Sequence, residues 1–144
     1  MIRKGPVLLM LIGLMTAGAL AFAQDAERAL IDSMPPVVIE TIPIAGDLTV
    51  DPNTTEICVS FSKDMRTDIW SWVQVNDNTF PDITGEIKYL DDNRTCILPV
   101  KLKPGKAYAI WLNSDKNLNF KDVRGKPAVP YLLAFKTKKM VSSQ

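Results

Sequence analysis

The chain has 144 residues, with 17 Lys and Arg, 16 Asp and Glu, and no histidine. This near-neutral balance gives no electrostatic basis for binding nucleic acid or an anionic membrane surface. The lack of histidine excludes Ser-His and Cys-His catalysis and histidine-based zinc sites.

Residues 1–23 have the pattern of a signal peptide. Arg3 and Lys4 supply a positive start, and an apolar run with a few small or hydroxyl side chains follows. Ala21 and Ala23 place small side chains at the two positions that a signal peptidase reads. The run is short for a bilayer span, which takes about 20 apolar residues. We therefore predict an exported protein, periplasmic or at the cell surface, that is cleaved after Ala23 and not inserted in the membrane; an uncleaved anchor is the alternative.

A leader of residues 24–35 separates the predicted signal from the body of the chain. Asp25 can cap a short helix whose Leu30, Ile31 and Met34 fall on one side. The Pro-Pro pair that follows would end this helix. The alternative is a disordered leader, because isolated helices this short are marginal in water.

Short segments of period-2 apolar alternation, broken by turn residues every ten or so positions, fill residues 36–138. This pattern predicts one all-β sandwich domain, followed by a frayed tail at 139–144. The predicted strands are 37–41, 48–50, 56–62, 69–75, 85–90, 95–100, 107–112 and 131–137. The inward sets include Ile57, Val59 and Phe61, then Tyr108, Ile110 and Leu112, then Tyr131, Leu133 and Phe135. Between the last two strands lies a long polar loop.

The two cysteines, Cys58 and Cys96, fall on opposite faces of their predicted strands. Alternation turns Cys58 outward, away from the set of Ile57 and Val59, and turns Cys96 inward with Leu98. Thiols on opposite faces of a sheet cannot meet the narrow Cα and Cβ geometry of a disulfide. We predict no disulfide, although a β-bulge that rotates the register would allow one.

Several short motifs, taken in order, carry a family resemblance. They are Ile-x-Val-x-Phe-Ser-Lys-x-Met at 57–65, Leu-x-Pro-Gly-x-x-Tyr-x-Ile-x-Leu at 102–112, Asp-x-x-Gly at 122–125 and Phe-x-Thr at 135–137. Together they resemble a bacterial Ig-like domain of the SbsA type, first named from surface-layer proteins. The resemblance implies a Greek-key sandwich of about seven antiparallel strands. It also implies a non-catalytic module that serves exported proteins as a spacer, adhesion or accessory domain.

The sequence offers little for catalysis, metals or cofactors. It has no glycine-rich phosphate loop and no Gly-x-Ser-x-Gly elbow. The acidic candidates are Asp91 with Asp92, and Asp115 to Asp122 in the long loop; we interpret them as solvated turn residues. The long loop holds too few oxygen ligands for calcium. We expect a protein that is not an enzyme and that binds no metal or cofactor.

The tryptophans are the unusual feature. If residues 69–75 alternate with Ser71 and Val73 inward, Trp70 and Trp72 point outward. Trp111 points outward from its strand. In the topology that the resemblance implies, the strands 69–75 and 107–112 are neighbours in one sheet, and the last strand adds Leu132 beside them. We therefore predict a ligand or partner face made of Trp70, Trp72, Trp111 and Leu132.

Three hypotheses account for this face. The leader helix can fold back, so that Leu30, Ile31 and Met34 cover the indoles. The face can instead bind a protein of the cell envelope or a second copy of the chain, since tryptophan is enriched at binding hot spots. It can also stack on the sugar rings of a glycan. A covered face corresponds to a structural or accessory envelope module with no ligand site. A face that binds a protein corresponds to a binding or assembly module, and a face that binds sugars corresponds to a carbohydrate-binding module.

Overall fold

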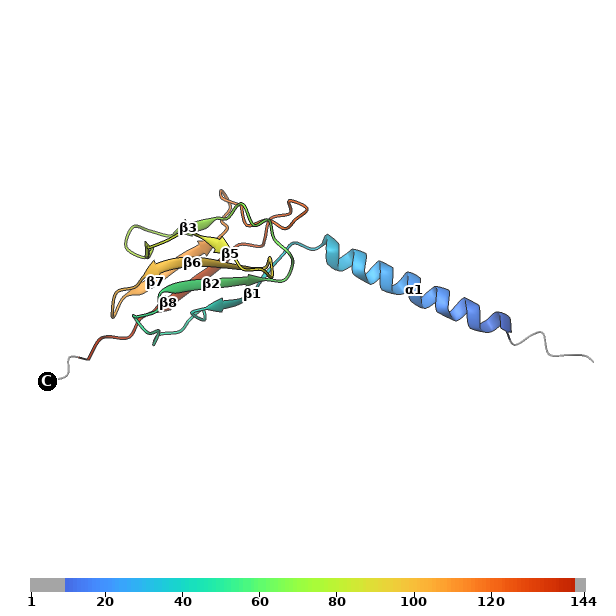
Figure 1. Ribbon diagram of the computed structural model, residues 1–144, viewed down its shortest axis with the longest axis horizontal. Coiled ribbons are helices and arrows are strands. Elements are labelled where there is room, and N and C mark those ends of the chain that lie inside the picture. The colour runs from blue at the N-terminus through green and yellow to red at the C-terminus, as the bar shows by residue number, and fades with distance from the viewer. Residues whose placement is uncertain (1–9, 142–144) are drawn as a thin grey trace, which may run out of the picture. The chain divides into compact units, whose positions relative to one another are not determined.

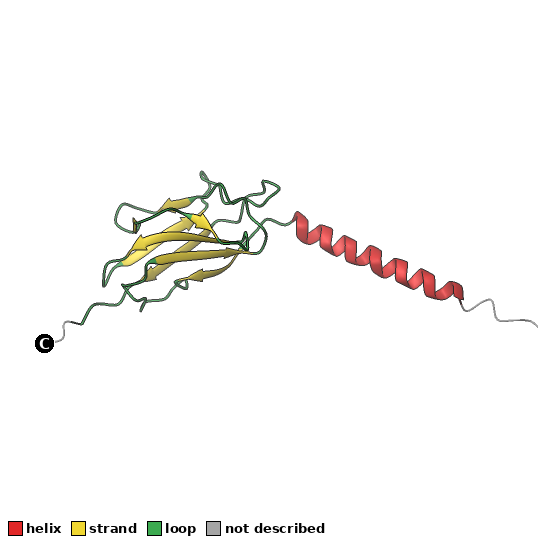
Figure 2. Cartoon of the chain, in the orientation of Figure 1, coloured by secondary structure: helices red, strands yellow, loops and turns green. Residues whose placement is uncertain are grey.

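The computed structural model describes residues 10–141. The chain divides into two units, the first ending at Met34 and the second beginning at Pro35. The first unit is helical, and the second consists of strands and loops (Figures 1 and 2). This division agrees with the predicted start of the sandwich at residue 36, because the Pro35-Pro36 pair cannot continue a helix.

The helical unit contains α1, Met10–Ser33. The prediction of a helix start at Asp25 is wrong, because the helix runs through this position without a break. Ala, Leu, Glu and Arg dominate the sequence on both sides of Asp25, and these residues favour helix. The helix ends on an i→i+3 bond from Met34 N to the Ile31 carbonyl at 3.1 Å. Part of the predicted signal peptide, residues 1–9, lies outside the described residues. Over the part of the chain that is described, we find no helix with the length and apolarity needed to cross a bilayer.

The larger sheet of the second unit has five strands. β2, Glu56–Phe61, lies between β1, Val38–Ile42, and β6, Thr95–Lys101. Two short strands pair with the far side of β6, namely β4, Asp82–Ile83, and β5, Lys88–Tyr89. β2 and β6 run side by side through the middle of this sheet (Figure 1).

The smaller sheet has three strands in the order β3, β7, β8. They are β3, Trp72–Gln74, β7, Ala107–Leu112, and β8, Tyr131–Lys136. The strand pairs within both sheets are antiparallel throughout the described residues. The predicted fold class, an all-β antiparallel sandwich, is confirmed.

The core fills the space between the two sheets. Every second residue of β2 and β7 is buried, as the alternation predicted, and in β8 Leu133 and Phe135 are buried while Tyr131 is half-buried. Around these residues the aromatic rings pack in pairs, with Phe61 5.0 Å from Phe120 and Tyr108 5.4 Å from Phe135, centroid to centroid. Each large apolar side chain that is fully buried stabilises the fold by about 1.5–3 kcal/mol. The buried inward residues of the three strands are Ile57, Val59, Phe61, Tyr108, Ile110, Leu112, Leu133 and Phe135.

The predicted strands differ from the observed ones mainly where they are short. Residues 48–50 form no strand, and Val50 instead makes a single parallel bridge to Thr137. The predicted strand 69–75 is reduced to β3, and the predicted strand 85–90 to β5. β4 was not predicted, because Asp82 and Ile83 are too short a segment to show alternation.

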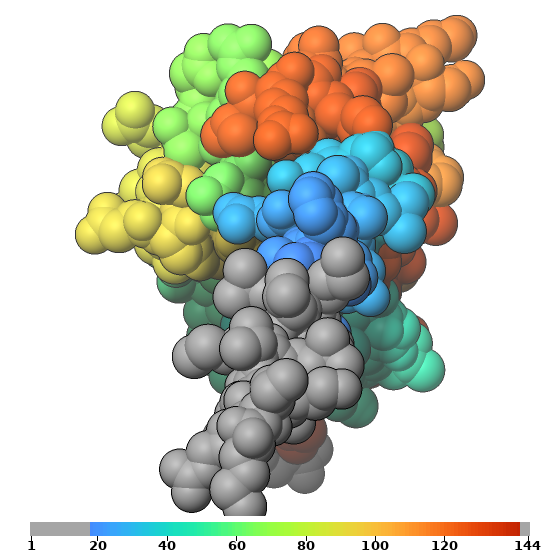
Figure 3. Space-filling view, turned by 90° about the vertical axis from the view of Figure 1, so that its right-hand side faces the viewer, coloured from blue at the N-terminus to red at the C-terminus, as the bar shows by residue number. Residues whose placement is uncertain are grey.

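The long loop after β7 is held at one end of the sandwich by its own turn and by the chain near residue 65. Asp122 Oδ1 accepts hydrogen bonds from Arg124 N at 3.0 Å and from Lys126 N at 2.8 Å. Gly125 of this turn has φ 85°, a conformation that glycine adopts without steric cost. Met65 bridges to Asp122, so the green and orange-red surfaces of these two segments adjoin in Figure 3.

Candidate functional site

The outer face of the three-stranded sheet has an apolar row that crosses all three strands. Val73 of β3 lies opposite Trp111 of β7, and Trp111 lies opposite Leu132 of β8. Their neighbours along the strands, Ile110, Leu112 and Leu133, are buried, so the row points away from the core. Leu132 is 42% exposed. We call this surface the Trp111 face and define it by Val73, Ala109, Trp111, Leu132 and Ala134.

A shallow cavity extends the Trp111 face at one end. Its volume is about 350 Å³, and Trp111, Ser114, Asp115 and Pro130 line it. Trp111 is in β7, Ser114 and Asp115 follow this strand in the loop, and Pro130 directly precedes β8. The cavity therefore gives the otherwise flat face an indentation beside the indole, into which a protruding apolar side chain of a partner would fit.

The predicted outward position of Trp72 is wrong. Trp72 lies in register with Leu112, and its ring meets Phe120 edge-on at 5.6 Å and 77°. Residues 69–71 are not in a strand, so the alternation counted from Ile69 slips by one residue before β3 begins. Ser71 is buried as well, and its hydroxyl accepts a hydrogen bond from Asn119 N in the loop after β7 at 3.0 Å. Trp72 is half-buried and packs against the core.

Trp70 also lies away from the Trp111 face. It precedes β3 and packs against the core cluster that contains Phe61 and Phe120. Its side chain is half-buried and lines two hollows of about 370 Å³ each. Ile87, between β4 and β5, is the other residue that both hollows share. We call these two hollows together the edge groove, since β3, β4 and β5 lie at the edges of their sheets.

The two hollows of the edge groove differ in chemistry. One hollow, the amide hollow, is lined by Trp70, Trp72, Gln74, Phe80, Asn117 and Asn119. The other, the acidic hollow, is lined by Asp68, Trp70, Glu86, Lys88, Tyr89 and Asp91. The sequence pattern did not reveal this groove, because its walls come from both sheets and from the loop after β7.

The carboxylate of Asp68 is already paired. Arg66 donates to it from Nη2 at 2.8 Å and from Nε at 3.2 Å. The hydrogen bond from Arg66 lowers the pKa of Asp68 below its usual value. Both side chains are exposed, so this pair contributes little to stability. It does reduce the negative charge at the mouth of the acidic hollow.

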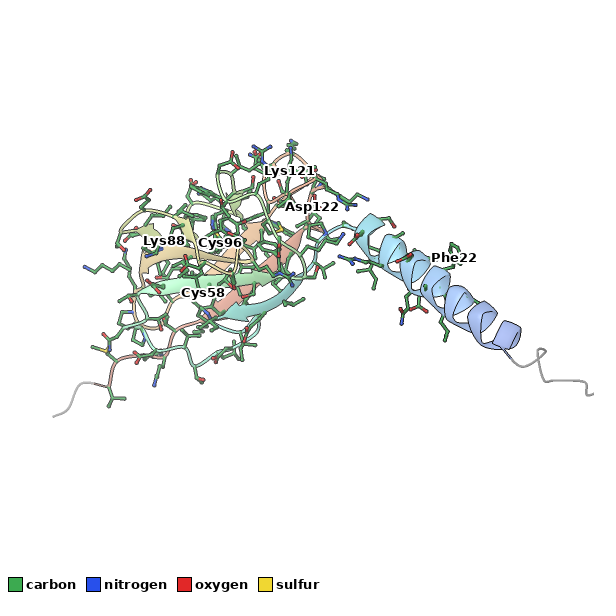
Figure 4. All side chains as sticks on the ribbon, turned by 45° about the vertical axis from the view of Figure 1, so that its right-hand side comes forward. Phe22, Cys58, Lys88, Cys96, Lys121 and Asp122 are labelled. Carbon is green, nitrogen blue, oxygen red and sulfur yellow. The ribbon has the colours of Figure 1, made fainter. Side chains whose placement is uncertain are left out.

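The cysteines lie on opposite faces of the larger sheet, as predicted. Cys58 is in register with Ile97, and Val59 with Cys96, so alternation turns the two thiols apart (Figure 4). Both thiols are free in this structure. Burial raises the pKa of Cys96 to about 12, and burial also raises the pKa of Cys58. Neither thiol has the lowered pKa that a nucleophilic cysteine needs.

The acidic candidates in turns have hydrogen-bonding partners from their own backbone. Asp92 Oδ1 accepts bonds from Arg94 N and Thr95 N, both at 2.9 Å. Asp122 closes the turn described above. Across the described residues no group of three or more His, Cys, Asp or Glu side chains is placed to hold a metal ion. These carboxylates are accounted for as parts of turns.

The fold and these surfaces define a class of protein. Two antiparallel sheets of five and three strands, with an interleaved aliphatic core, form an immunoglobulin-like β-sandwich whose distinguishing surfaces are apolar and aromatic. The chain belongs to the bacterial Ig-like domain family, whose profile matches residues 32–137. Domains of this family are generally non-catalytic.

Among solved structures, the sandwich is similar to part of the surface-layer protein rSbsC. The similarity has a TM-score of 0.51 at 20% identity, and covers 85% of this chain but 16% of that chain. At this identity the likeness establishes the fold. No match was found among curated proteins.

Proposed function

We propose that this chain is an exported, non-catalytic binding or assembly module that acts in the periplasm or at the cell surface. The family assignment and the predicted signal peptide support this location. The surface-layer protein that shares the fold supports it as well. The observation that carries the binding function is the Trp111 face, an apolar row across a regular three-strand surface.

The partner that fits the Trp111 face is another protein of the cell envelope. The face is a broad sheet surface with a central indole, and tryptophan is enriched at protein–protein hot spots. Its small neighbours, Ala109 and Ala134, leave the indole accessible from the side of the sheet. The outward face of the larger sheet also has an apolar row, Ile42, Cys58 and Ile97, but the polar side chains of Glu40, Ser60 and Thr95 lie beside it and make it less suited to a dry interface.

A Leu132→Glu variant tests this proposal. A charge beside the indole of the Trp111 face is unpaired on binding, so we expect at least tenfold weaker association with the envelope partner. The measurement is photo-crosslinking from a probe at residue 109 in envelope extract, followed by affinity measurement with the identified protein. Val123→Glu is the matched control, since Val123 is 66% exposed and lies in the loop after β7. Equal affinity of Leu132→Glu and Val123→Glu would contradict the proposal.

A second copy of the chain or the leader could occupy the Trp111 face instead, and each has its own test. Light scattering detects a homodimer, which Leu132→Glu would dissociate. Removal of residues 24–33 detects a leader that covers the face, because Trp111 fluorescence would then shift to the red. A stable monomer with an unchanged spectrum and no crosslinked partner would favour the alternative function, a structural or accessory module with no ligand site.

A further inference from the structure

We propose that the edge groove binds a neutral glycan chain, with the indole of Trp70 as the central stacking platform. This site adjoins the Trp111 face at Val73, which lines the amide hollow, but it contains neither Trp111 nor Leu132, and nothing in the proposed assembly function requires it. Trp70 is the aromatic side chain that the two hollows have in common. A ligand that crosses the groove must therefore pass over this indole.

The amide hollow has the hydrogen-bonding groups that sugars need. Each side-chain amide offers two N–H donors and a carbonyl acceptor, which match pairs of neighbouring hydroxyl groups. Asn117 and Asn119 are exposed, and their side-chain amides make no hydrogen bond within the described residues. Gln74 donates from Nε2 to Asp77 Oδ1 at 2.7 Å, and this bond orients its carbonyl oxygen as an acceptor. Apolar C–H faces of the sugar would stack on the rings of the same hollow.

The charges of the acidic hollow decide which glycan fits. Glu86 and Asp91 face a single lysine, Lys88, within the lining. A polyanionic chain would meet net repulsion here. A basic peptide would gain little from charge here, because Arg66 already pairs with Asp68 and Lys88 offsets one of the two remaining carboxylates, Glu86 and Asp91. A neutral chain satisfies both hollows.

The dimensions favour an oligosaccharide over a single sugar. Each hollow has a volume of about 370 Å³, and each is large enough by itself for a small ligand. Because the hollows lie on either side of Trp70 and Ile87, a chain of several sugar units would occupy both at once. The binding energy of such a chain comes from several weak contacts, so loss of the central platform should reduce it most.

Affinity electrophoresis with a defined panel tests this proposal. The probes are hydroxyethyl cellulose, mixed-linkage β-glucan, soluble starch, dextran and glycol chitin, with polygalacturonate as the anionic probe and deca-lysine as the basic peptide. We expect at least one neutral polysaccharide to retard the protein, and Trp70→Ala to weaken that binding at least tenfold. Polygalacturonate should give no retardation.

Two further variants keep the test independent of folding. Gln74→Ala combined with Asn117→Ala removes two exposed amides, and should weaken binding at least threefold with no change in Tm. Trp111→Ala is the matched tryptophan control and should bind the polysaccharide like the wild type, whatever it does to a protein partner. The proposal is overturned by no retardation with any neutral probe, by equal binding of Trp70→Ala and Trp111→Ala, or by binding of deca-lysine in place of the polysaccharides.

Discussion

Asn113 and Phe120 are joined by two reciprocal hydrogen bonds. Asn113 Nδ2 donates to the Phe120 carbonyl at 2.9 Å, and Phe120 N donates to Asn113 Oδ1 at 2.9 Å. The same Nδ2 also donates to the Ala128 carbonyl at 3.0 Å. Asn113 is fully buried with φ 60°. The side chain of Asn113 thus provides hydrogen-bond partners for backbone groups of the loop after β7, which a neighbouring strand would otherwise provide.

Replacing Asn113 should be severely destabilising. Asn113→Ala leaves buried backbone groups of Phe120 and Ala128 without partners, at about 1–3 kcal/mol for each unsatisfied group. We expect a loss of at least about 3 kcal/mol in urea unfolding. Asn113→Gly removes the same hydrogen bonds, but glycine adopts the positive φ without strain. Comparison of the two variants therefore separates the cost of the lost bonds from the cost of backbone strain. Asn117→Ala is the control, because it removes an exposed amide. If Asn113→Ala lowered the free energy of unfolding as little as Asn117→Ala, the bonds of Asn113 would not hold the loop.

Trp72 and Trp111 should respond differently to truncation. Trp72 packs on Phe120 within the core, so Trp72→Ala should cost about 3–5 kcal/mol. Trp111 makes cross-strand contacts on the outer face, and Trp111→Ala should cost about 1 kcal/mol or less. Urea denaturation of both variants measures the difference. A larger loss for Trp111→Ala would indicate that another segment covers the Trp111 face.

The carboxylate of Asp92 should make stability depend on pH. The Thr95 hydroxyl, which donates to Asp92 Oδ2 at 2.6 Å, is the largest cause of the lowered pKa of Asp92, followed by the backbone N–H of Arg94. A carboxylate with a lowered folded pKa stabilises the fold above its unfolded pKa, about 3.9, and this contribution is lost as pH falls through the folded pKa. The free-energy difference between wild type and Asp92→Asn should therefore be constant from about pH 5 upward and shrink below about pH 4.

Asp115→Asn is the control for this pH dependence, because Asp115 is an exposed carboxylate in the long loop. Unfolding is followed by tryptophan fluorescence between pH 2 and pH 8. Parallel curves for wild type and Asp92→Asn at every pH would show that the Thr95 bond does not stabilise the charged carboxylate.

The thiols should react in a defined order. Cys58 is half-buried and outward, whereas Cys96 is fully buried with its pKa raised to about 12. At pH 8 a thiol reagent should label Cys58 slowly in the folded protein and Cys96 only after unfolding. The intact mass of the unreduced protein should equal that of the dithiol form, as predicted from the opposite faces. A mass two hydrogens lower would identify a disulfide.

Cleavage of the predicted signal is tested in an exporting bacterial host. We expect the mature protein to begin at Gln24, since Ala21 and Ala23 fit the peptidase. Ala23→Leu should block cleavage at this position, and Ala26→Leu, on the other side of the cleavage site, should leave it unchanged. Intact mass and N-terminal sequencing read the result. An uncut wild-type chain would support the anchor alternative.

Much of the sandwich could be predicted because its long strands have an amphipathic period. The alternation in β2 and β7 assigned Ile57, Val59, Tyr108 and Ile110 to the core without knowledge of their neighbours. The same argument placed Cys58 and Cys96 on opposite faces. It also predicted the outward position of Trp111, whereas the place of Leu132 beside it came from the topology that the family resemblance implies.

The edge groove could not be predicted, because no local period describes it. Trp70 lies outside a strand, and Ile87, which lines both hollows with it, lies between two strands of the other sheet. The inward position of Trp72 depends on where β3 begins, and this start is decided by bonds from Asn113 and Asn119 to Ser71. Such bonds join residues far apart in the chain.

The amino-acid sequence by itself determined the fold class, the family resemblance and the inward faces of the long strands, because period-2 burial is a local property of an extended backbone. Only the tertiary structure decided which indoles belong to the core, which to the Trp111 face and which to the edge groove. The reason is that short irregular segments take their conformation from distant partners, and a shift of one residue moves a side chain from one face of a sheet to the other.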